Sequence, residues 1–435
     1  MTKQLIMKSM NLNKKLLYVA IFLIVILNYR VNIYANEPEA TDLTKSTTIS
    51  ISSGSDSLFL KDQSSATKKT LNGSDTITIT NDTGIKSIYI IWEQPPGEWQ
   101  LEVNGVSITY GKYGFIHEYI ALDDTVKKAV IHLPAAGAII ADVSSFSVGT
   151  AQSWVQVWKP PYEEADIVVL PTHADDEFLF FGGTMPYYAG ELGLKVQVVY
   201  LTNHWAEYYR PHELLNGLWE VGITAYPIIG PFTDYYSTSL EHAMTLYPIN
   251  DVIGFQVQMI RRFKPKVIIA QDFNGEYGHG VHRLNTYTLS KALEISNNAS
   301  TYPESAVKYG AWDVPKTYVH LYEKNQLTMN WDVPLDSFGG TTAFDMAVRG
   351  FAKHKSQQAY YKVGREGVFN CMLFGLYRST VGEDIKKNDF LENINVFRTY
   401  NYLRKSSIIP LNEQTENSYQ VNTGVVHKLT LNSVK

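Results

Sequence analysis

Short apolar runs alternate with amphipathic helical patterns from about residue 162 onward, and this alternation limits the fold more than any other feature. The runs cover 167–170, 196–201 and 267–270, and the helical patterns cover about 211–221 and 252–263. Runs that are apolar at every position are typical of strands buried on both faces. Strands that alternate with helices predict a Rossmann-like α/β domain, with a parallel sheet flanked by helices.

The preceding region, residues 58–158, has a different pattern. Short β-type runs recur between turn signals, and Asn104-Gly105 is a strong hairpin signal. The predicted strands cover 76–80, 88–92, 99–103, 106–108, 130–133 and 154–158. Regularly spaced short strands predict an antiparallel β-sandwich domain ahead of the α/β domain. Its tryptophans are either core residues or part of a carbohydrate-contacting surface; they are Trp92, Trp99, Trp154 and Trp158.

The N-terminus has the pattern of an export signal. Lysines precede an apolar run over 16–27, which is shorter than the about 20 residues that a membrane crossing needs. We predict a signal peptide or N-terminal anchor over 1–35, then a polar linker over 36–57. The expected location is secreted or cell-surface, with no integral membrane span after signal removal.

Cysteine usage and charge narrow the class of protein. Cys371 is the one cysteine, so no disulfide can form within the chain; in an exported protein this favours a bacterial source. We expect Cys371 to be a buried structural thiol. The formal net charge of −5 provides no basic face, so a nucleic-acid partner is not expected. The first α/β strand leads to no Gly-x-Gly-x-x-Gly loop, which argues against a dinucleotide-binding protein.

Candidate metal ligands follow two of the α/β strands, where active sites of open parallel sheets lie. His173, Asp175 and Asp176 follow the run at 167–170, and His279 and His282 follow the run at 267–270. Histidine and carboxylate ligands suit zinc, and hydrolysis also needs a base for the attacking water. Each group also has a plain structural interpretation, as a helix N-cap or a packed histidine. Their coincidence at two strand ends favours a catalytic metal site.

These segments resemble signatures of the PIG-L (LmbE-like) deacetylase family. His173-Ala174-Asp175-Asp176-Glu177 is similar to the family's His-Pro-Asp-Asp-Glu, and Gly278-His279-Gly280-Val281-His282 to its Gly-His-Pro-Asp-His. Other similar segments are Val199-Tyr200-Leu201-Thr202, Arg210-Pro211-His212-Glu213-Leu214, Val221-Gly222-Ile223 and Lys353-His354-Lys355-Ser356-Gln357. The motifs keep the family's order across about residues 165–393, which suggests a deacetylase domain over 162–435.

The resemblance implies an LmbE-like fold, one zinc ion and a set of residue roles. It implies that His173, Asp176 and His282 bind the zinc. Asp175 is then the general base, and His279 stabilises the oxyanion or protonates the leaving amine. Arg210 matches a substrate-contacting arginine, although a salt bridge to Glu213 is an equally good interpretation. We also predict substrate contacts for residues in the loops after the second and third strands, namely Asn203 and Asn274.

Two positions depart from the family pattern. Ala174 replaces a proline, and Val281 replaces an aspartate that neighbours the active-site histidine. An apolar neighbour cannot stabilise an imidazolium, so we expect a lower pKa for His279 than in relatives. Asp272 and Glu276 are the acids considered as substitutes for the missing aspartate.

The resulting functional prediction is a zinc-dependent hydrolase, acting on a linear amide C–N bond. It removes the N-acetyl group of an N-acetylhexosamine-containing glycan or glycoconjugate outside the cytoplasm. Its expected partner is an N-acetylated sugar or polysaccharide. Two alternatives stay open: a zinc amidase that acts on a non-sugar amide, and a non-catalytic glycan-binding surface protein.

Overall fold

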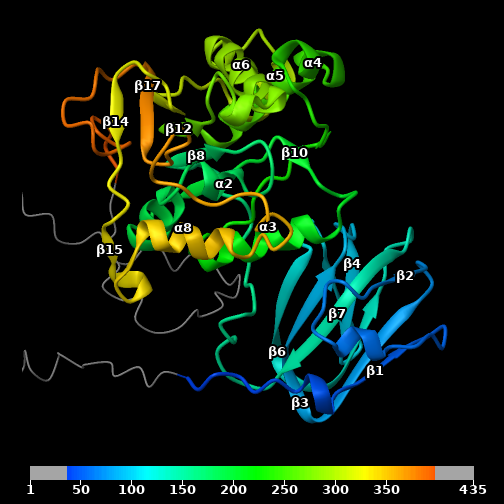
Figure 1. The fold of residues 1–435 in the computed structure, drawn as a ribbon. Helices are drawn as coiled ribbons and strands as arrows, with labels where there is room; N and C mark the ends of the chain where they lie inside the picture. Colours follow the sequence, from blue (N-terminus) through cyan, green and yellow to red (C-terminus); the bar gives the residue numbers. More distant parts are fainter. Residues whose placement is uncertain (1–36, 397–435) are drawn as a thin grey trace, which may run out of the picture. The chain divides into compact units, whose positions relative to one another are not determined.

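The computed structural model describes residues 37–396. The predicted signal peptide or anchor, 1–35, lies outside the described residues, and so does the end of the chain after residue 396. Within the described part, the chain forms two large sheets (Figure 1).

The first large sheet has seven strands, and every pairing in it is antiparallel. They are β1 (Thr48–Ile51), β2 (Lys69–Leu71), β3 (Thr76–Trp92), β4 (Trp99–Val103), β5 (Val106–Tyr110), β6 (His117–His132) and β7 (Ala138–Phe146). The predicted hairpin is confirmed, because Val103 pairs with Val106 across Asn104-Gly105. Both turn residues have positive φ, at 52° and 79°, as a type I′ turn requires.

The sandwich prediction is not confirmed, since the strands belong to one hydrogen-bonded sheet in the order β2-β7-β3-β6-β4-β5, with β1 also on β3. The reason lies in β3, which joins the runs predicted separately at 76–80 and 88–92. On one side it pairs with β6 along most of its length. On the other side it pairs with β1 in its first half and with β7 in its second half.

Two further predictions for this region are wrong. The segment 36–57, predicted as a linker, contains β1, which pairs with β3 from Thr48↔Thr80 to Ile51↔Ile77. The segment 154–158 is not a strand. Its Val155 is buried with Tyr89 and Phe146 against the sheet, so packing against side chains replaces strand pairing.

The tryptophans of this region are mostly core residues. Trp92, Trp99 and Trp158 are between 0% and 7% exposed, and the first two direct their indole N–H groups to Glu118. Only Trp154 of the four is exposed, at 42%. Three of the four therefore cannot form the carbohydrate-contacting surface.

The second large sheet has six strands in the order β14-β17-β13-β12-β8-β9. They are β8 (Ile167–Leu170), β9 (Val196–Val198), β12 (Val267–Ala270), β13 (Lys316–His320), β14 (Gln326–Thr328) and β17 (Leu373–Ser379). The pairings among β9, β8, β12 and β13 are parallel, as predicted, whereas β17 is antiparallel to both its neighbours. The sheet is therefore mixed.

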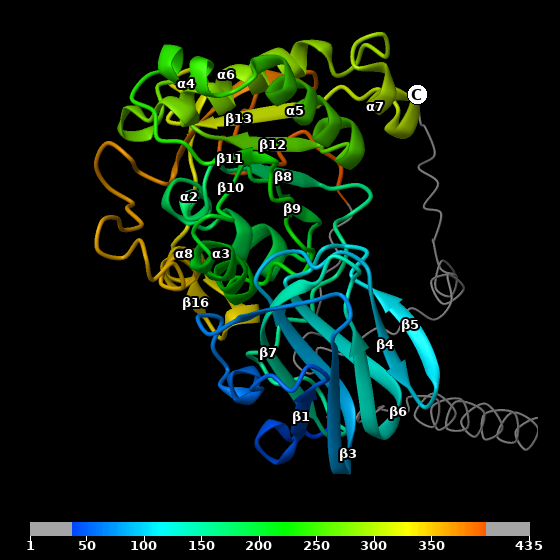
Figure 2. The same ribbon diagram turned by 90° about the vertical axis from the view of Figure 1, so that its right-hand side faces the viewer.

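Helices cover both faces of this sheet (Figure 2). Val168 and Leu170 of β8 pack in a cluster with α5 and α6, while Ile167 and Val169 pack with α2, α3 and α8. Because successive side chains of a strand point to opposite faces of the sheet, half of the β8 side chains pack against the helices on each face. The helices are α2 (Asp176–Leu179), α3 (Tyr209–Glu220), α4 (Leu240–Leu246), α5 (Ile249–Phe263), α6 (Gly280–Ile295), α7 (Pro303–Tyr309) and α8 (Ala343–Phe351). The short sheets β10 (Thr202–Asn203)–β11 (Phe232–Thr233) and β15 (Pro334–Leu335)–β16 (Thr341–Thr342) complete the strands of the described residues.

Close packing explains the glycine pair after α2. A Cβ at Gly182 would lie 2.8 Å from the Cys371 sulfur, and one at Gly183 would lie 2.7 Å from the Ala343 Cβ. These glycines therefore let α8 and the Cys371 segment approach closely. Cys371 itself is buried, as predicted. Among residues 37–396, no helix combines the length and apolarity needed to cross a membrane.

Candidate active site

The two motif loops meet at the carboxyl edge of the mixed sheet. β8 and β12 are neighbours in parallel register, so the loops that follow them leave the sheet side by side. The backbone N–H of Thr172 donates to Gln271 Oε1 at 2.9 Å, and Asn285 of α6 donates to Thr172 Oγ1 at 3.0 Å. These buried hydrogen bonds fix the two loops against each other.

Three donor atoms converge between these loops. His173 Nδ1 lies 3.0 Å from His282 Nε2, and Asp176 Oδ2 lies 3.2 Å from the first and 3.3 Å from the second. Donors about 2.0–2.1 Å from a tetrahedral zinc lie roughly 3.3 Å apart. The spacing and chemistry of this set therefore fit one zinc-sized ion.

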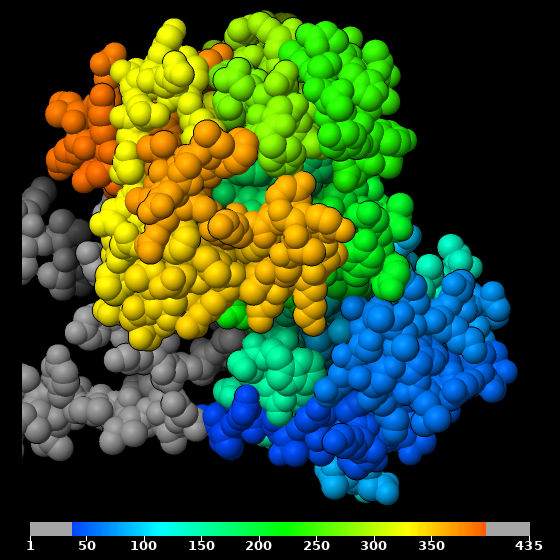
Figure 3. Space-filling model, in the orientation of Figure 1, coloured from blue at the N-terminus to red at the C-terminus, as the bar shows by residue number. Residues whose placement is uncertain are grey.

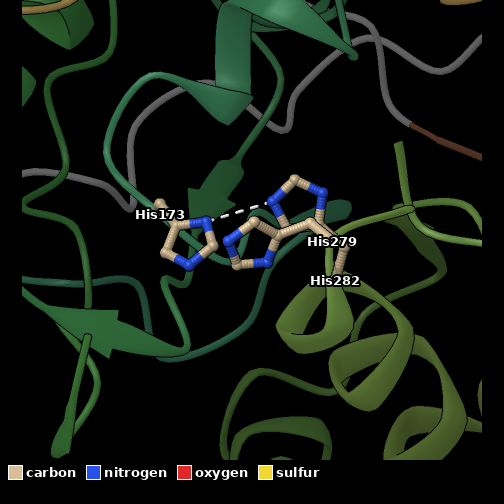
Figure 4. Close-up of side chains that lie close together, drawn as sticks. All are labelled: His173, His279 and His282. Atoms are coloured by element: carbon tan, nitrogen blue, oxygen red, sulfur yellow. Dashed lines mark hydrogen bonds between the residues drawn. The ribbon is translucent and has the colours of Figure 1, made fainter. Parts of the chain in front are cut away.

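His279 stands beside this set. Its ring stacks on His282 with centroids 4.7 Å apart, and Figure 4 shows its imidazole next to the His173–His282 pair. The nitrogens of His173, His279 and His282 lie within 4.8 Å of one another, which defines an alternative three-histidine donor set. We favour the set with Asp176, because its three mutual distances are shorter and nearly equal.

Outer carboxylates orient the two ligand histidines. His173 Nε2 lies 3.2 Å from Asp234 Oδ1, and His282 Nδ1 lies 2.9 Å from Glu276 Oε2. Glu276 is fully buried and also contacts His320 Nδ1, at 2.7 Å. Such partners fix which ring nitrogen faces the metal.

These carboxylates make the centre favourable for positive charge. Burial opposes the charged form of His173, but Asp234 and Asp176 outweigh it and raise the pKa of His173 to about 10. Against the same opposition, Asp176 and Glu276 raise the pKa of His282 to about 9. A divalent cation would be stabilised at this centre by the same acids.

Asp175 is held in a strained and charged environment. Its φ of 118° is unusual for a residue other than glycine, and its N–H donates to Glu177 Oε2 at 2.7 Å. Burial and Asp176 raise the pKa of Asp175 to about 7, against the opposing effect of Arg210. A carboxylate with a pKa near neutrality is suited to act as a general base.

His279 is the N-cap of α6, and its Nδ1 accepts from the Val281 N–H at 3.3 Å. Nδ1 is therefore an acceptor, and Nε2 carries the proton of the neutral ring. Burial, then the neighbouring His173 and His282, lower the pKa of His279 to about 3. The expectation that His279 has a lower pKa than in relatives, because of Val281, stays a prediction.

Neither acid proposed as a substitute at Val281 takes that role. Glu276 contacts His282 and His320, as described above, and Asp272 accepts a hydrogen bond from the backbone N–H of Asn274. The acids that favour the charged form of His279 are Asp176 and Asp234.

Arg210 belongs to the site, whereas Glu213 does not pair with it. Arg210 Nη2 lies 3.4 Å from Asp175 Oδ1 and donates to the Ala174 carbonyl, and Nη1 lies 3.7 Å from Glu207. Glu213 instead accepts from the N–H and hydroxyl of Ser356, at 2.9 and 2.6 Å. The salt bridge between Arg210 and Glu213 that the sequence allowed is therefore wrong.

The segment at 353–357, which resembles a family motif, has a supporting function. Besides the Ser356–Glu213 contact, His354 Nε2 lies 2.8 Å from Glu177 Oε1, and both side chains are fully buried. Glu177 in turn receives the Asp175 N–H. The segment thus supports the backbone at Asp175 from behind the site.

Asn203 and Asn274 remain predictions as substrate contacts. Asn203 Nδ2 donates to the Gly230 carbonyl at 3.4 Å. Asn274 is exposed, and its carbonyl accepts from Arg283. These contacts are local and connect neither residue with the donor set.

Several residues of the site were not found by sequence reasoning. They are Asp234, His204, Glu276 in its role at His282, and His320. His204 Nε2 accepts a hydrogen bond from the Ala174 N–H at 3.1 Å. It lies in the loop after the second predicted α/β strand, but no role was predicted for it. Asp234 follows a two-residue strand, β11, which is too short for a periodic signal, and His320 ends a strand that was not predicted.

Buried histidines and carboxylates around a common centre, with a further acid beside them, form a candidate metal site at the edge of an α/β sheet. The PIG-L family model, described as GlcNAc-PI de-N-acetylase, matches residues 168–293. These residues form a PIG-L family domain.

Curated relatives are similar over part of the chain. One, 1D-myo-inositol 2-acetamido-2-deoxy-alpha-D-glucopyranoside deacetylase of Mycobacterium leprae, is 27% identical over 188 residues, which cover 37% of this chain and 61% of the relative. The enzyme of the same name from Rhodococcus erythropolis is 25% identical over 235 residues, 44% of this chain and 78% of the relative. This chain thus spans about three fifths of the length of the M. leprae relative.

Two solved structures are similar to part of this chain. N,N'-diacetylchitobiose deacetylase from Pyrococcus horikoshii has a TM-score of 0.34 at 17% identity, covering 45% of this chain and 72% of that chain. A conserved protein from Thermus thermophilus has a TM-score of 0.34 at 18% identity, covering 45% of this chain and 81% of that chain.

Proposed function

We propose that this protein is a zinc-dependent deacetylase that removes the N-acetyl group from an N-acetylhexosamine-containing glycan or glycoconjugate. The observation that carries the proposal is the triangle of His173 Nδ1, Asp176 Oδ2 and His282 Nε2, with sides of 3.0–3.3 Å, beside the buried Asp175. The PIG-L domain and the named activity of the relatives support the choice of an acetamido sugar as substrate.

A zinc ion held by these three side chains would supply Lewis acidity at the acetamide carbonyl. Asp175 accepts the proton of the attacking water as the new C–O bond forms. His279 donates its Nε2–H to the carbonyl oxygen as negative charge develops there. The C–N bond then breaks, Asp175 returns the proton to the leaving nitrogen, and acetate and a free amine result.

Arg210 has a positioning role in this proposal. Its guanidinium contacts both the Asp175 carboxylate and the Ala174 carbonyl. It therefore holds the strained residue in place and favours the ionised carboxylate that accepts a proton. Contact between Arg210 and the substrate remains part of the prediction.

We also propose that the activity lies outside the cytoplasm, in a secreted or cell-surface protein. The support is the cationic and then apolar N-terminal segment. Protease accessibility of a tagged chain on intact cells tests the location, and complete protection in intact cells together with digestion after lysis would contradict it.

Acetate release from N-acetylglucosamine and its oligomers, before and after treatment with a chelator, tests the activity. We expect release to stop on metal removal and to return when zinc is added. Release that is insensitive to the chelator would contradict the metal assignment. Release from acetylated peptides or lipids, but from no sugar, would indicate an amidase of a different substrate class.

A further inference from the structure

Exposed aromatic side chains lie around the donor set, and none of them has a role in the proposed chemistry. We call Tyr236, Tyr277, Tyr361 and Phe369 the aromatic rim. They are 74%, 43%, 40% and 37% exposed, respectively. They come from three segments that are far apart in sequence: the loop after β11, the turn before α6, and the segment 352–372 after α8. Exposed aromatic rings gathered from distant segments are typical of an interaction surface.

The rim is continuous with the metal centre. Tyr236 and Tyr277 both pack edge-on against the His279 ring, with centroids 5.3 and 5.8 Å apart. Tyr361 stacks on Tyr277 at 5.7 Å and 22°, and Phe369 packs edge-on against Tyr277 at 6.1 Å. A ligand whose acetamide reaches the donor set would therefore meet these rings as well.

The surface is hollowed where these segments meet. Figure 3 shows teal atoms of the β8–α2 region at the bottom of a hollow, between the lime-green segment near residue 280 and the orange segment near residue 360. The charges of Asp175 and Asp176, after burial, contribute to a raised pKa of Tyr361, which places this ring within electrostatic range of the acids.

The chemistry of the rim favours a sugar over a lipid. Three of its four members are tyrosines, each with a flat apolar face and a hydroxyl at the tip. A pyranose ring offers the complementary surface, with C–H groups on one face and hydroxyls at the edge. Tyr236 and Tyr277 contact the His279 ring directly, whereas Tyr361 and Phe369 contact Tyr277.

We propose that Tyr361 and Phe369 form a subsite for the sugar residues next to the one that is deacetylated, so the substrate is an oligo- or polysaccharide. This inference rests on the proposed deacetylase function and extends it to the substrate class. Tyr236 and Tyr277 pack directly against His279, so substitutions at these two positions would not separate binding from chemistry.

The test compares kcat/KM for acetate release from tetra-N-acetylchitotetraose and from N-acetylglucosamine. In wild-type protein we expect the tetrasaccharide to be preferred. In the double variant Tyr361→Ala/Phe369→Ala we expect this preference to fall by about tenfold, because both ring faces proposed to contact the outer sugars are removed; a tenfold change corresponds to about 1.4 kcal/mol. Tyr361→Trp, which keeps a flat ring, should retain the preference.

Tyr113→Ala is the matched control, because Tyr113 is 43% exposed but belongs to the loop between β5 and β6 of the antiparallel sheet. It should change neither rate. Equal losses on both substrates in the double variant, or no loss on either, would overturn the subsite. Vesicle binding by the wild-type protein that the double variant loses, with unchanged glycan kinetics, would overturn it in favour of a lipid surface.

Binding separates this inference from the proposed function. Calorimetric titration of tetra-N-acetylchitotetraose into chelator-treated protein needs no turnover. Binding that depends on Tyr361 and Phe369, together with no acetate release by the zinc-loaded protein, would support the subsite and contradict the deacetylase. Acetate release with the same substrate preference in both proteins would contradict the subsite alone.

Discussion

Two buried pairs of histidines have nearly the same geometry. One pair lies at the candidate metal centre, and the other connects the antiparallel sheet with α3. His173 Nδ1 and His282 Nε2 are 3.0 Å apart. His117 of β6 and His212 of α3 bring Nε2 and Nδ1 to 2.8 Å. All four residues are at most 6% exposed. Burial and distance alone therefore do not separate a metal site from a structural contact.

The carboxylates around each pair make the difference. Asp176 lies 3.2–3.3 Å from both facing nitrogens of the first pair, and Asp234 and Glu276 lie on the outer nitrogens. Around the second pair, Tyr89 contacts His117 at 2.8 Å, and Glu93 is 3.8 Å from His212 on the outer side. Burial, followed by His212, keeps the pKa of His117 well below its usual range.

The comparison teaches that converging negative charge, rather than a histidine pair, defines the candidate cation site. Where a carboxylate joins two facing nitrogens, the centre favours a cation. Where none does, the two rings share a hydrogen bond, which here links β6 to the helix that carries Arg210. The following changes test this distinction.

The largest effect is expected from His173→Ala. The change removes one of three donors, and it takes one histidine partner from both Asp176 and Asp234. We expect zinc content close to zero and no measurable acetate release, as determined by atomic absorption and an acetate assay. Full zinc occupancy in this variant would contradict both donor sets, because His173 belongs to each of them.

Asp175→Asn should separate metal binding from turnover. Asn has the same shape and tolerates positive φ but cannot accept the proton. We expect turnover to fall by about 10²–10⁴-fold, with zinc content unchanged. Near wild-type turnover would show that another group is the base.

Glu276→Gln tests the outer carboxylates. Glutamine keeps the shape but removes the charge that supports His282 and His320. We expect zinc affinity to weaken by about 10–100-fold, measured by competition with a chromogenic chelator. An unchanged affinity would mean that Glu276 serves only the packing of β13.

The smallest effect on the metal centre is expected from His212→Leu. Leaving His117 buried without this partner costs about 1–3 kcal/mol, measured by urea unfolding, while zinc content stays at the wild-type level. Since replacing both partners with apolar groups is less costly than replacing one, His117→Leu/His212→Leu should recover part of the loss. Loss of zinc in the single variant would contradict the distinction between the two pairs.

Local patterns predicted much of the fold and most of the donor atoms. The apolar runs at 167–170 and 267–270 are the central strands β8 and β12. They could be predicted because a strand that is buried on both faces is apolar at every position. The loops that follow them carry the donors, because the carboxyl ends of neighbouring parallel strands share one edge. The hairpin at Asn104-Gly105 was equally readable, since its turn type requires those residues.

Predictions failed where the answer depended on distant partners. The sandwich was predicted from strand spacing, but spacing does not report which edges of β3 are hydrogen-bonded, and β1 and β7 occupy the same side. The tryptophans were ambiguous for the same reason, since Trp92 and Trp99 are buried in that sheet and Trp158 is buried against Trp219 and Tyr226. Asp234 and His320 carry no local signal, because they meet their histidine or acid partners only in the folded chain.

The sequence by itself determined the chemistry available at this centre: histidines and aspartates after two buried strands, in spacings similar to those of the PIG-L family. Tertiary structure alone decided which of them converge, which acids stand behind them, and that tyrosines from three segments line the approach. The physical reason is that donor type and strand burial are local properties of the chain. Charge balance and surface shape arise from side chains about 40 to 190 residues apart, and only folding brings these together.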